Sequence, residues 1–185
     1  MVVSNLRKIE IRKGTSRIIL ISSLFPNLVV KVPIVRLRVG VKTIFTERKR
    51  LHNKETWDEE VWWGIGWCLY KGILDNWREY RFYKNTKHQF LQPTFFSLLG
   101  LINFQKRGEL IQCDYVKFWR CIHNATDRGA MSDSHHFSET RNFCLNSGVK
   151  ILDYGSPRTQ LIIKKFGVKI MEDLDLNFPE LNRVT

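Results

Sequence analysis

Three features are missing from this 185-residue sequence, and each absence narrows the class of protein. The four cysteines are scattered and no two form a CxxC pair, which favours reduced thiols over disulfides. They are Cys68, Cys113, Cys121 and Cys144. The N-terminus, MVVSNLRKIE, lacks the apolar core of a secretory signal. The most apolar stretch, Pro93 to Phe104, is well short of the roughly twenty residues that span a bilayer. We therefore expect a cytoplasmic protein with no membrane segment.

Acidic residues are also scarce. The chain has 18 Asp and Glu against 30 Lys and Arg, which gives a formal net charge of +12. Such a surface attracts polyanions, so nucleotides, nucleic acid or an acidic protein are the expected partners. Hydrophobic residues make up 43% of the chain, enough for one domain with a core of its own.

The N-terminal part has the pattern of β-strands. RKIEIRK and SRIILIS flank a turn at Gly14-Thr15-Ser16, and LVVKVPIV follows a second turn at Phe25-Pro26-Asn27. Apolar residues alternate or run together in each segment, which predicts three short antiparallel strands within residues 7–39.

Two helices are predicted next. Thr56 and Glu59 have the spacing of a capping box, and apolar residues follow at helical intervals over residues 57–70. A second helix is predicted from Asp75, in DNWREYRFYKNT, and carries Glu79 beside Phe82.

The rest of the chain alternates between strands and helices. FFSLLGLINF and ELIQC suit a buried hairpin with a turn at 106–108. Asp114 is placed to cap a helix, DYVKFWRCIHN, with Val116, Trp119 and Ile122 facing inward. A polar loop, two strands around a turn at 146–148 and a helical tail from Pro157 complete the chain.

Two stretches near the C-terminus carry a resemblance. A β-branched strand runs into Asp153-Tyr154-Gly155 in VKILDYGSPRTQ, which taken alone also fits a turn with Gly155 at positive φ. Just upstream, HHFSETRNFCL has the length and end pattern of the protein-kinase catalytic loop, with His135 on its first histidine and Asn142 on its metal-binding asparagine. The chain thus resembles a protein kinase, reduced in size.

The resemblance implies a fold, a cofactor and a set of site residues. It implies an α+β protein-kinase-like fold in one domain, with residues 1–112 similar to the N-lobe and 113–185 to a minimal C-lobe. ATP and Mg²⁺ would be the cofactors. LVVKVP is similar to the strand that carries the phosphate-binding lysine, here Lys31, and Glu79 resembles the glutamate that pairs with it. Asn142 and Asp153 would hold Mg²⁺.

Three departures from the kinase pattern limit what the resemblance implies. Phe137 stands where the family has its catalytic aspartate and cannot accept a proton, so Asp133 or Glu139 would have to orient a substrate hydroxyl. RKGTSR replaces the Gly-rich loop, so Ser16 or Arg17 would have to contact the phosphates. Barely thirty residues follow Asp153, too few for the usual C-lobe. The resemblance thus implies a minimal kinase, or a pseudokinase that acts by binding a partner.

Each site residue also has a structural explanation. Lys31 fits a sheet edge, Glu79 a surface ion pair, Asn142 a turn cap, and Asp153 a hydrogen-bonding partner of the backbone that follows it. A different class of function therefore stays open: a small basic nucleic-acid-binding or inhibitor protein on a non-catalytic kinase-like scaffold. The basic run ERKRLHNK and the six tryptophans suit single-stranded nucleic acid, or else a solvated face and a core.

Two metal-dependent alternatives rest on the histidine pair. His135 and His136 could join Cys121, His123 and Cys144 in a zinc site, but their spacing fits no common ligand pair. An HNH nuclease would need a further histidine downstream, and none follows His136.

Overall fold

The computed structural model describes residues 9–36, 38, 41–42, 45 and 70–182. It is an α+β fold with a five-stranded antiparallel sheet, a small second antiparallel sheet and helices around both. The helix predicted over residues 57–70, and Cys68 with it, lie outside the described residues.

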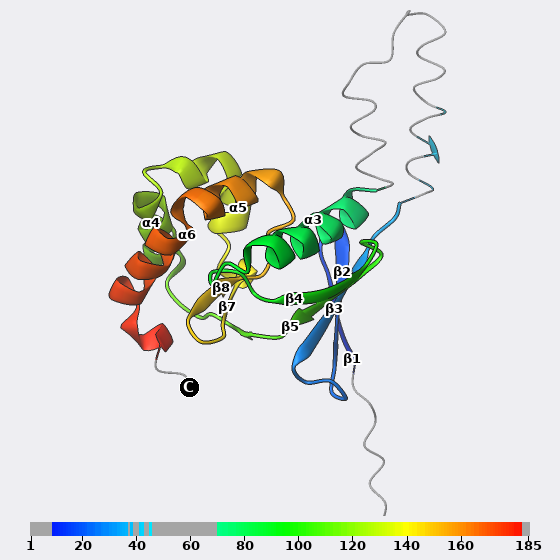
Figure 1. The fold of residues 1–185 in the computed structure, drawn as a ribbon, viewed down its shortest axis with the longest axis horizontal. Coiled ribbons are helices and arrows are strands. Elements are labelled where there is room, and N and C mark those ends of the chain that lie inside the picture. The colour runs from blue at the N-terminus through cyan, green and yellow to red at the C-terminus, as the bar shows by residue number, and fades with distance from the viewer. Residues whose placement is uncertain (1–8, 37, 39–40, 43–44, 46–69, 183–185) are drawn as a thin grey trace, which may run out of the picture.

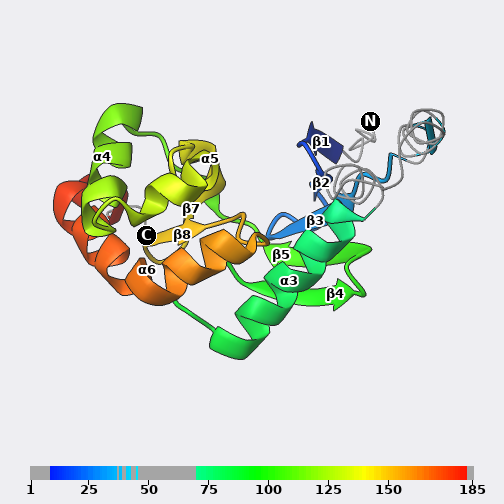
Figure 2. The ribbon, with the colours of Figure 1, turned by 90° about the horizontal axis from the view of Figure 1, so that it is seen from above.

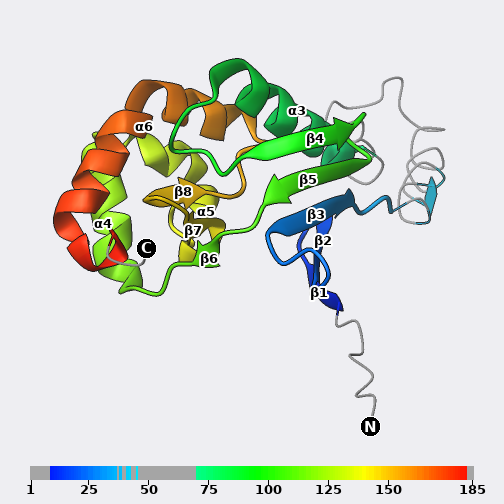
Figure 3. The same cartoon turned by 60° about the horizontal axis from the view of Figure 1, so that its bottom comes forward.

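The first three strands of the large sheet are the three predicted from the sequence. They are β1 (Ile9–Lys13), β2 (Arg17–Ser22) and β3 (Leu28–Pro33), joined antiparallel in that order. β5 (Ile102–Lys106) pairs with β3, and β4 (Thr94–Leu98) lies at the edge (Figure 3). Lys31 is therefore in the central strand, opposite Ile19 of β2 and Asn103 of β5.

The β4–β5 turn differs from the predicted one. It lies at Leu99 and Gly100, whose φ angles of 49° and 79° are both left-handed. A Cβ on Gly100 would come within 2.2 Å of the carbonyl oxygen of Ile73, so the close approach also requires glycine. The predicted turn at 106–108 is wrong, because β6 (Glu109–Leu110) leaves the large sheet and pairs with β7 instead.

Helix α3 (Lys71–Thr86) crosses one face of the large sheet (Figure 2). It begins four residues before the predicted start. The layer between helix and sheet is polar: Arg17, Lys31, Thr94, Asn103 and Gln105 from the strands meet Asn76 and Glu79 from the helix, and all seven are buried. Buried polar groups cost stability unless they are hydrogen-bonded, so the packing of α3 on the sheet depends on the hydrogen bonds and ion pairs within this layer.

The C-terminal half has an apolar core instead. β7 (Phe143–Leu145) and β8 (Val149–Ile151) complete the second sheet, and helices α4 (Tyr115–Ala125) and α6 (Pro157–Asn177) pack beside it (Figure 1). Short helical segments occupy the predicted polar loop and the end of the chain: η1 (Gly129–Asp133), α5 (Ser134–Phe137), η2 (Thr140–Asn142) and η3 (Pro179–Asn182). Phe90, from the segment after α3, is fully buried in this core, so the two halves share it.

Helix α4 confirms one prediction and corrects another. The Asp114 carboxylate accepts a 2.6 Å hydrogen bond from the backbone N–H of Lys117, as an N-cap does. The buried face is Phe118, Cys121, Ile122 and Ala125, whereas Val116 is exposed and Trp119 only partly buried. The shift follows from α6, which packs along that face.

The remaining elements agree with the sequence. β7 and β8 meet at the predicted turn, with Ser147 and Gly148 at positive φ, and α6 starts at Pro157 as predicted. Within the described part of the chain, no helix has the length and apolar character needed to cross a membrane.

Candidate functional site

A large cleft runs between the five-stranded sheet and the C-terminal half. Its volume is about 1790 Å³, and Lys31, Asp133, His136, Glu139, Asn142 and Asp153 are among the residues that line it. Nine of the lining residues are Lys or Arg and five are Asp or Glu. Five of the six residues predicted for the site therefore line one basic cleft. The sixth, Glu79, is buried behind it and contacts Lys31.

Lys31 and Glu79 form a buried ion pair at the base of the cleft. Lys31 Nζ lies 2.8 Å from Glu79 Oε1, and the two side chains are 5% and 0% exposed. Thr94 Oγ1 donates to the same Glu79 oxygen at 3.2 Å. Burial lowers the pKa of Lys31, and the nearby Arg17 lowers it further, while Glu79 acts in the opposite direction. The predicted contact is present, and the sheet-edge and surface alternatives for these two residues do not hold.

Lys31 also contacts the strand end that carries the Asp-Tyr-Gly stretch. Its Nζ donates a 2.7 Å hydrogen bond to the carbonyl oxygen of Leu152, the residue before Asp153. A lysine of the central strand and the predicted metal-binding aspartate thus lie within a nucleotide's reach of each other, as the site prediction requires.

Arg17 connects the two acidic residues of the site. It is the first residue of β2, and its side chain is 8% exposed. Nη1 lies 2.8 Å from Glu79 Oε2, and Nη2 forms an ion pair with Asp153 Oδ1. Burial alone would lower the pKa of Arg17, but Asp153 and Glu79 outweigh it and raise that pKa. Arg17 is therefore a permanently charged group inside the site.

Of the two carboxylates that Arg17 contacts, Asp153 is the one that lines the cleft, with 34% of its side chain exposed. Its Oδ1 contacts Arg17 and lies 3.9 Å from His136 Nε2. Burial favours the protonated acid, but the charges of Arg17 and Lys31 outweigh it and hold the pKa of Asp153 well below its usual range. Asp153 is consequently a carboxylate at neutral pH.

Asn142 is held at the same strand ends. Its backbone carbonyl accepts a 2.7 Å hydrogen bond from Leu152 N–H, which fixes it beside Asp153. Its side-chain nitrogen donates to the carbonyl oxygens of His135 and His136, at 3.3 Å and 3.1 Å. The side-chain oxygen can still coordinate a metal ion. Asn142 therefore both stabilises the loop through its side-chain nitrogen and offers an oxygen ligand.

Phe137 is fully buried in the apolar core and belongs to α5. The position that resembles the catalytic aspartate thus serves packing. Asp133 is also buried, and its carboxylate accepts hydrogen bonds from Thr159 Oγ1 and, at 2.8 Å, from His136 Nδ1. Burial would raise the pKa of Asp133, but the His136 and Thr159 hydrogen bonds lower it. Glu139 is partly exposed and lies 3.2 Å from Arg141.

His136 was not predicted as part of a nucleotide site. Asp133 binds its Nδ1, while its Nε2 lies 3.9 Å from Asp153 Oδ1. Burial lowers its pKa, but the Asp133 hydrogen bond and the Asp153 charge produce a net rise. The signal that could have found this histidine is its i,i+3 spacing from Asp133, which puts both side chains on one side of a helical turn.

The histidine pair does not join Cys121 or Cys144 in the zinc site that was the alternative considered from the sequence. Among the described residues, one group has its ligand atoms within 4.8 Å of one another: Asp133, His135 and His136. Neither Cys121 nor Cys144 belongs to it. Both histidines place Nδ1 near the same Asp133 oxygen, so hydrogen bonding accounts for this cluster.

The Asp-Tyr-Gly stretch is anchored on both sides of Asp153. Tyr154 is fully buried, and its hydroxyl donates a 2.6 Å hydrogen bond to the carbonyl oxygen of Gln92. Gly155 packs against α3, since a Cβ there would lie 2.5 Å from the carbonyl oxygen of Asp75. Its φ is not among the positive ones, so close packing and not a left-handed turn explains this glycine.

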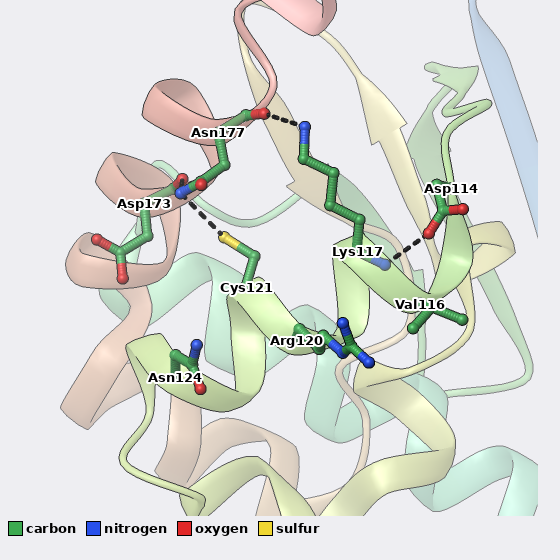
Figure 4. Close-up of a pocket in the computed structure, with 8 residues that line it drawn as sticks. All are labelled: Asp114, Val116, Lys117, Arg120, Cys121, Asn124, Asp173 and Asn177. Carbon is green, nitrogen blue, oxygen red and sulfur yellow. Dashed lines mark hydrogen bonds between the residues drawn. The ribbon is translucent and has the colours of Figure 1, made fainter.

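A second, smaller pocket of about 760 Å³ lies between α4 and α6 (Figure 4). Lys117 Nζ donates to the carbonyl oxygen of Asn177 at 2.9 Å, and the Asn177 amide contacts Cys121 Sγ at 3.7 Å. Burial raises the pKa of Cys121 to about 11, with a contribution from Asp173, so this thiol is protonated and unreactive at neutral pH. These contacts are those of a helix interface and assign no chemistry to the pocket.

Comparison with known proteins gives no match: no family model, no curated protein and no solved structure is similar to this chain.

Proposed function

We propose that this chain is a reduced, protein-kinase-like protein that binds ATP in the basic cleft. The observation that carries the proposal is the buried Lys31–Glu79 ion pair, which lies at the base of a cleft that Asp153 also lines. In this proposal residues up to about 112 correspond to an N-lobe and the rest to a minimal C-lobe. Lys31 contacts the phosphates, and Glu79 fixes the position of Lys31.

Burial of so many polar groups supports a binding site over a plain structural core. An apolar interior would stabilise the sheet and α3 at lower cost, and the C-terminal half of the same chain has one. The excess of basic residues around the cleft adds a favourable field for a triphosphate.

Mg²⁺ fits this site only in part. An aspartate carboxylate and an asparagine oxygen are ligands that Mg²⁺ accepts, and bound there it would neutralise phosphate charge. Asp153 Oδ1, however, is already paired with Arg17, so the ion would have to compete with a tethered cation. In the proposed function, ATP is therefore bound by side chains of the protein, with Lys31 at the phosphates.

The arrangement supports binding more strongly than phosphoryl transfer. Transfer to a hydroxyl needs a group that takes up its proton. Phe137 is in the core, the Asp133 carboxylate is taken by Thr159 and His136, and Glu139 pairs with Arg141. A pseudokinase that acts through its ATP-bound form and a protein partner is the version of the proposal that these contacts favour.

Thermal unfolding with ATP tests the proposal. ATP at about 100 times its dissociation constant should stabilise the protein by about 2.7 kcal/mol. Lys31→Met should abolish this gain, while Lys169→Met, an exposed lysine on α6, should keep it. If ATP stabilises the wild type in neither Mg²⁺ nor EDTA buffer, and a random oligonucleotide binds with steep salt dependence, the protein is the small basic nucleic-acid-binding alternative.

A further inference from the structure

Arg17 pairs with Asp153, a contact that the kinase resemblance does not imply. It lies at the start of β2, directly after the short Gly14-Thr15-Ser16 turn, where the Gly14 N–H donates to the Arg17 carbonyl oxygen at 2.8 Å. That tight hairpin leaves no loop of backbone amides long enough to cover a triphosphate. The hairpin that stands in place of the Gly-rich loop thus supplies a cationic side chain, Arg17, next to Asp153.

The guanidinium is held in place on two sides. Nη1 contacts Glu79 Oε2 at 2.8 Å and Asn76 Oδ1 at 3.3 Å, and Nη2 pairs with Asp153. A guanidinium has five N–H donors, and these contacts use three of them. Within the described part of the chain no group accepts from Nε or from the second Nη2 hydrogen, so both can approach an anion in the cleft, which Arg17 lines.

The charged residues of the site favour the Arg17 guanidinium over a bound Mg²⁺ as the cation next to Asp153. A tethered guanidinium is present at high local concentration and is weakly hydrated. Mg²⁺ loses its water reluctantly and needs near-octahedral oxygen ligands, whereas Asp153 Oδ1 is paired with Arg17 and lies near His136. Mg²⁺ at Asp153 must therefore either displace a mostly buried ion pair or bind through Oδ2 alone, beside the Arg17 guanidinium that repels it.

We propose that Arg17 takes the place of the divalent cation at Asp153, so that the cleft binds a nucleoside triphosphate without metal. Arg17 then meets the phosphates with its remaining donors, while Lys31 contacts them from the neighbouring strand. This inference rests on the proposed function, because it describes how the same cleft binds ATP.

ATP binding in EDTA and in Mg²⁺ buffer, measured by calorimetry, tests the inference on the whole chain. The wild type should bind ATP about equally well in the two buffers. Arg17→Ala should lose about tenfold or more in EDTA, the loss expected for a charge-assisted hydrogen bond, and Mg²⁺ should restore part of it. Arg81→Ala, an exposed arginine of α3 that does not line the cleft, should behave as the wild type.

Two further measurements keep the test independent of whether Arg17→Ala folds. Mn²⁺ alone, followed by electron paramagnetic resonance, should show no tight binding to the wild type. Asp153→Asn removes a negative charge that faces the phosphates, so ATP binding in EDTA should be kept or strengthened. If Asp153 were a metal ligand, Asp153→Asn should instead weaken ATP binding.

The outcomes separate the two proposals. ATP binding by the wild type that needs Mg²⁺ and is lost in Asp153→Asn overturns the inference and leaves the proposed function in place. No ATP binding in either buffer overturns the proposed function, and the inference with it.

Discussion

Lys31 Nζ and Glu79 Oε1 lie 2.8 Å apart between the central strand and α3, and both side chains are almost inaccessible to solvent. Glu79 is also the partner of Arg17 and accepts from Thr94, so one carboxylate compensates two buried cations. The polar layer of the N-terminal half depends on it.

Replacing Glu79 should therefore destabilise the fold severely. Glu79→Gln removes the charge and leaves Arg17 and Lys31 without their shared partner, which should lower the free energy of unfolding by about 3–5 kcal/mol. Urea unfolding followed by circular dichroism measures the loss. Glu172→Gln, an exposed residue on α6, is the matched control and should stay within about 0.5 kcal/mol of the wild type. Equal effects of the two substitutions would contradict the proposed dependence.

Gly155 should not tolerate a side chain. Its added Cβ would lie 2.5 Å from the carbonyl oxygen and 2.9 Å from the carbonyl carbon of Asp75, which are backbone atoms of α3 and cannot move aside. Gly155→Ala should cost about 1–3 kcal/mol of stability, the usual range for overpacking. The proposed ATP affinity should fall too, since Asp153 lies two residues away.

Gly129→Ala is the control for that substitution. Its Cβ would meet the Phe166 ring at 3.1 Å, and a side chain can shift by a few tenths of an ångström. Chemical denaturation of both variants should show the smaller loss for Gly129→Ala. The reverse order would mean that the contact between Gly155 and α3 is not a tight one.

How far the sequence predicts this fold depends on how local each feature is. Residues adjacent in sequence determine the three N-terminal strands, the β7–β8 turn and the Asp114 cap. All of these were predicted. The β4–β5 turn was misplaced because Gly108 follows the polar pair Lys106-Arg107 and gives a stronger local turn signal than Gly100, which lies inside an apolar run. What selects Gly100 is its contact with Ile73, which lies on another element.

The site shows the same limit. The Lys31–Glu79 contact was expected from the resemblance to protein kinases, in which a strand lysine pairs with a glutamate of the following helix. Arg17 follows a turn, where a basic residue usually points into solvent, and nothing near it in sequence indicates that it is buried. Its partners Glu79 and Asp153 are supplied by α3 and by the end of β8. The sequence offered Arg17 or Ser16 in place of the Gly-rich loop, but only the folded arrangement shows that Arg17 pairs with Glu79 and Asp153.

Tyr154 should stabilise the strand end that carries Asp153 through its hydroxyl group. That hydroxyl donates to the Gln92 carbonyl oxygen at 2.6 Å and lies 2.8 Å from Thr94 Oγ1, in a fully buried position. Tyr154→Phe leaves the carbonyl oxygen without this donor and should cost about 1–3 kcal/mol in urea unfolding. Tyr115→Phe, on the exposed first turn of α4, should change stability little. A Tyr154→Phe variant with the unfolding free energy of the wild type would show that the hydroxyl does not stabilise this strand end.

His136 should make stability depend on pH in a way that can be isolated. Burial lowers its pKa, but Asp133 and Asp153 outweigh both burial and Arg17, so its folded pKa is raised above the ordinary value. The stabilisation from charged His136 is therefore complete below about pH 6.5 and is lost as the pH rises through the folded pKa. His136→Asn, which keeps a donor for Asp133, should be most destabilising near pH 6 and progressively less so toward pH 8.

His135 provides the opposite case in the same short helix. Burial and the neighbouring His136 lower its pKa, so the unfolded chain binds its proton more readily and the native state loses stability as the pH falls. The difference in unfolding free energy between the wild type and His135→Asn should therefore shift in favour of the wild type as the pH rises, while the same difference for His136→Asn shifts against it. Urea unfolding of the three proteins at several pH values between 5.5 and 8 measures both trends. Parallel curves for the two variants would show that the Asp133 and Asp153 carboxylates do not distinguish the two histidines.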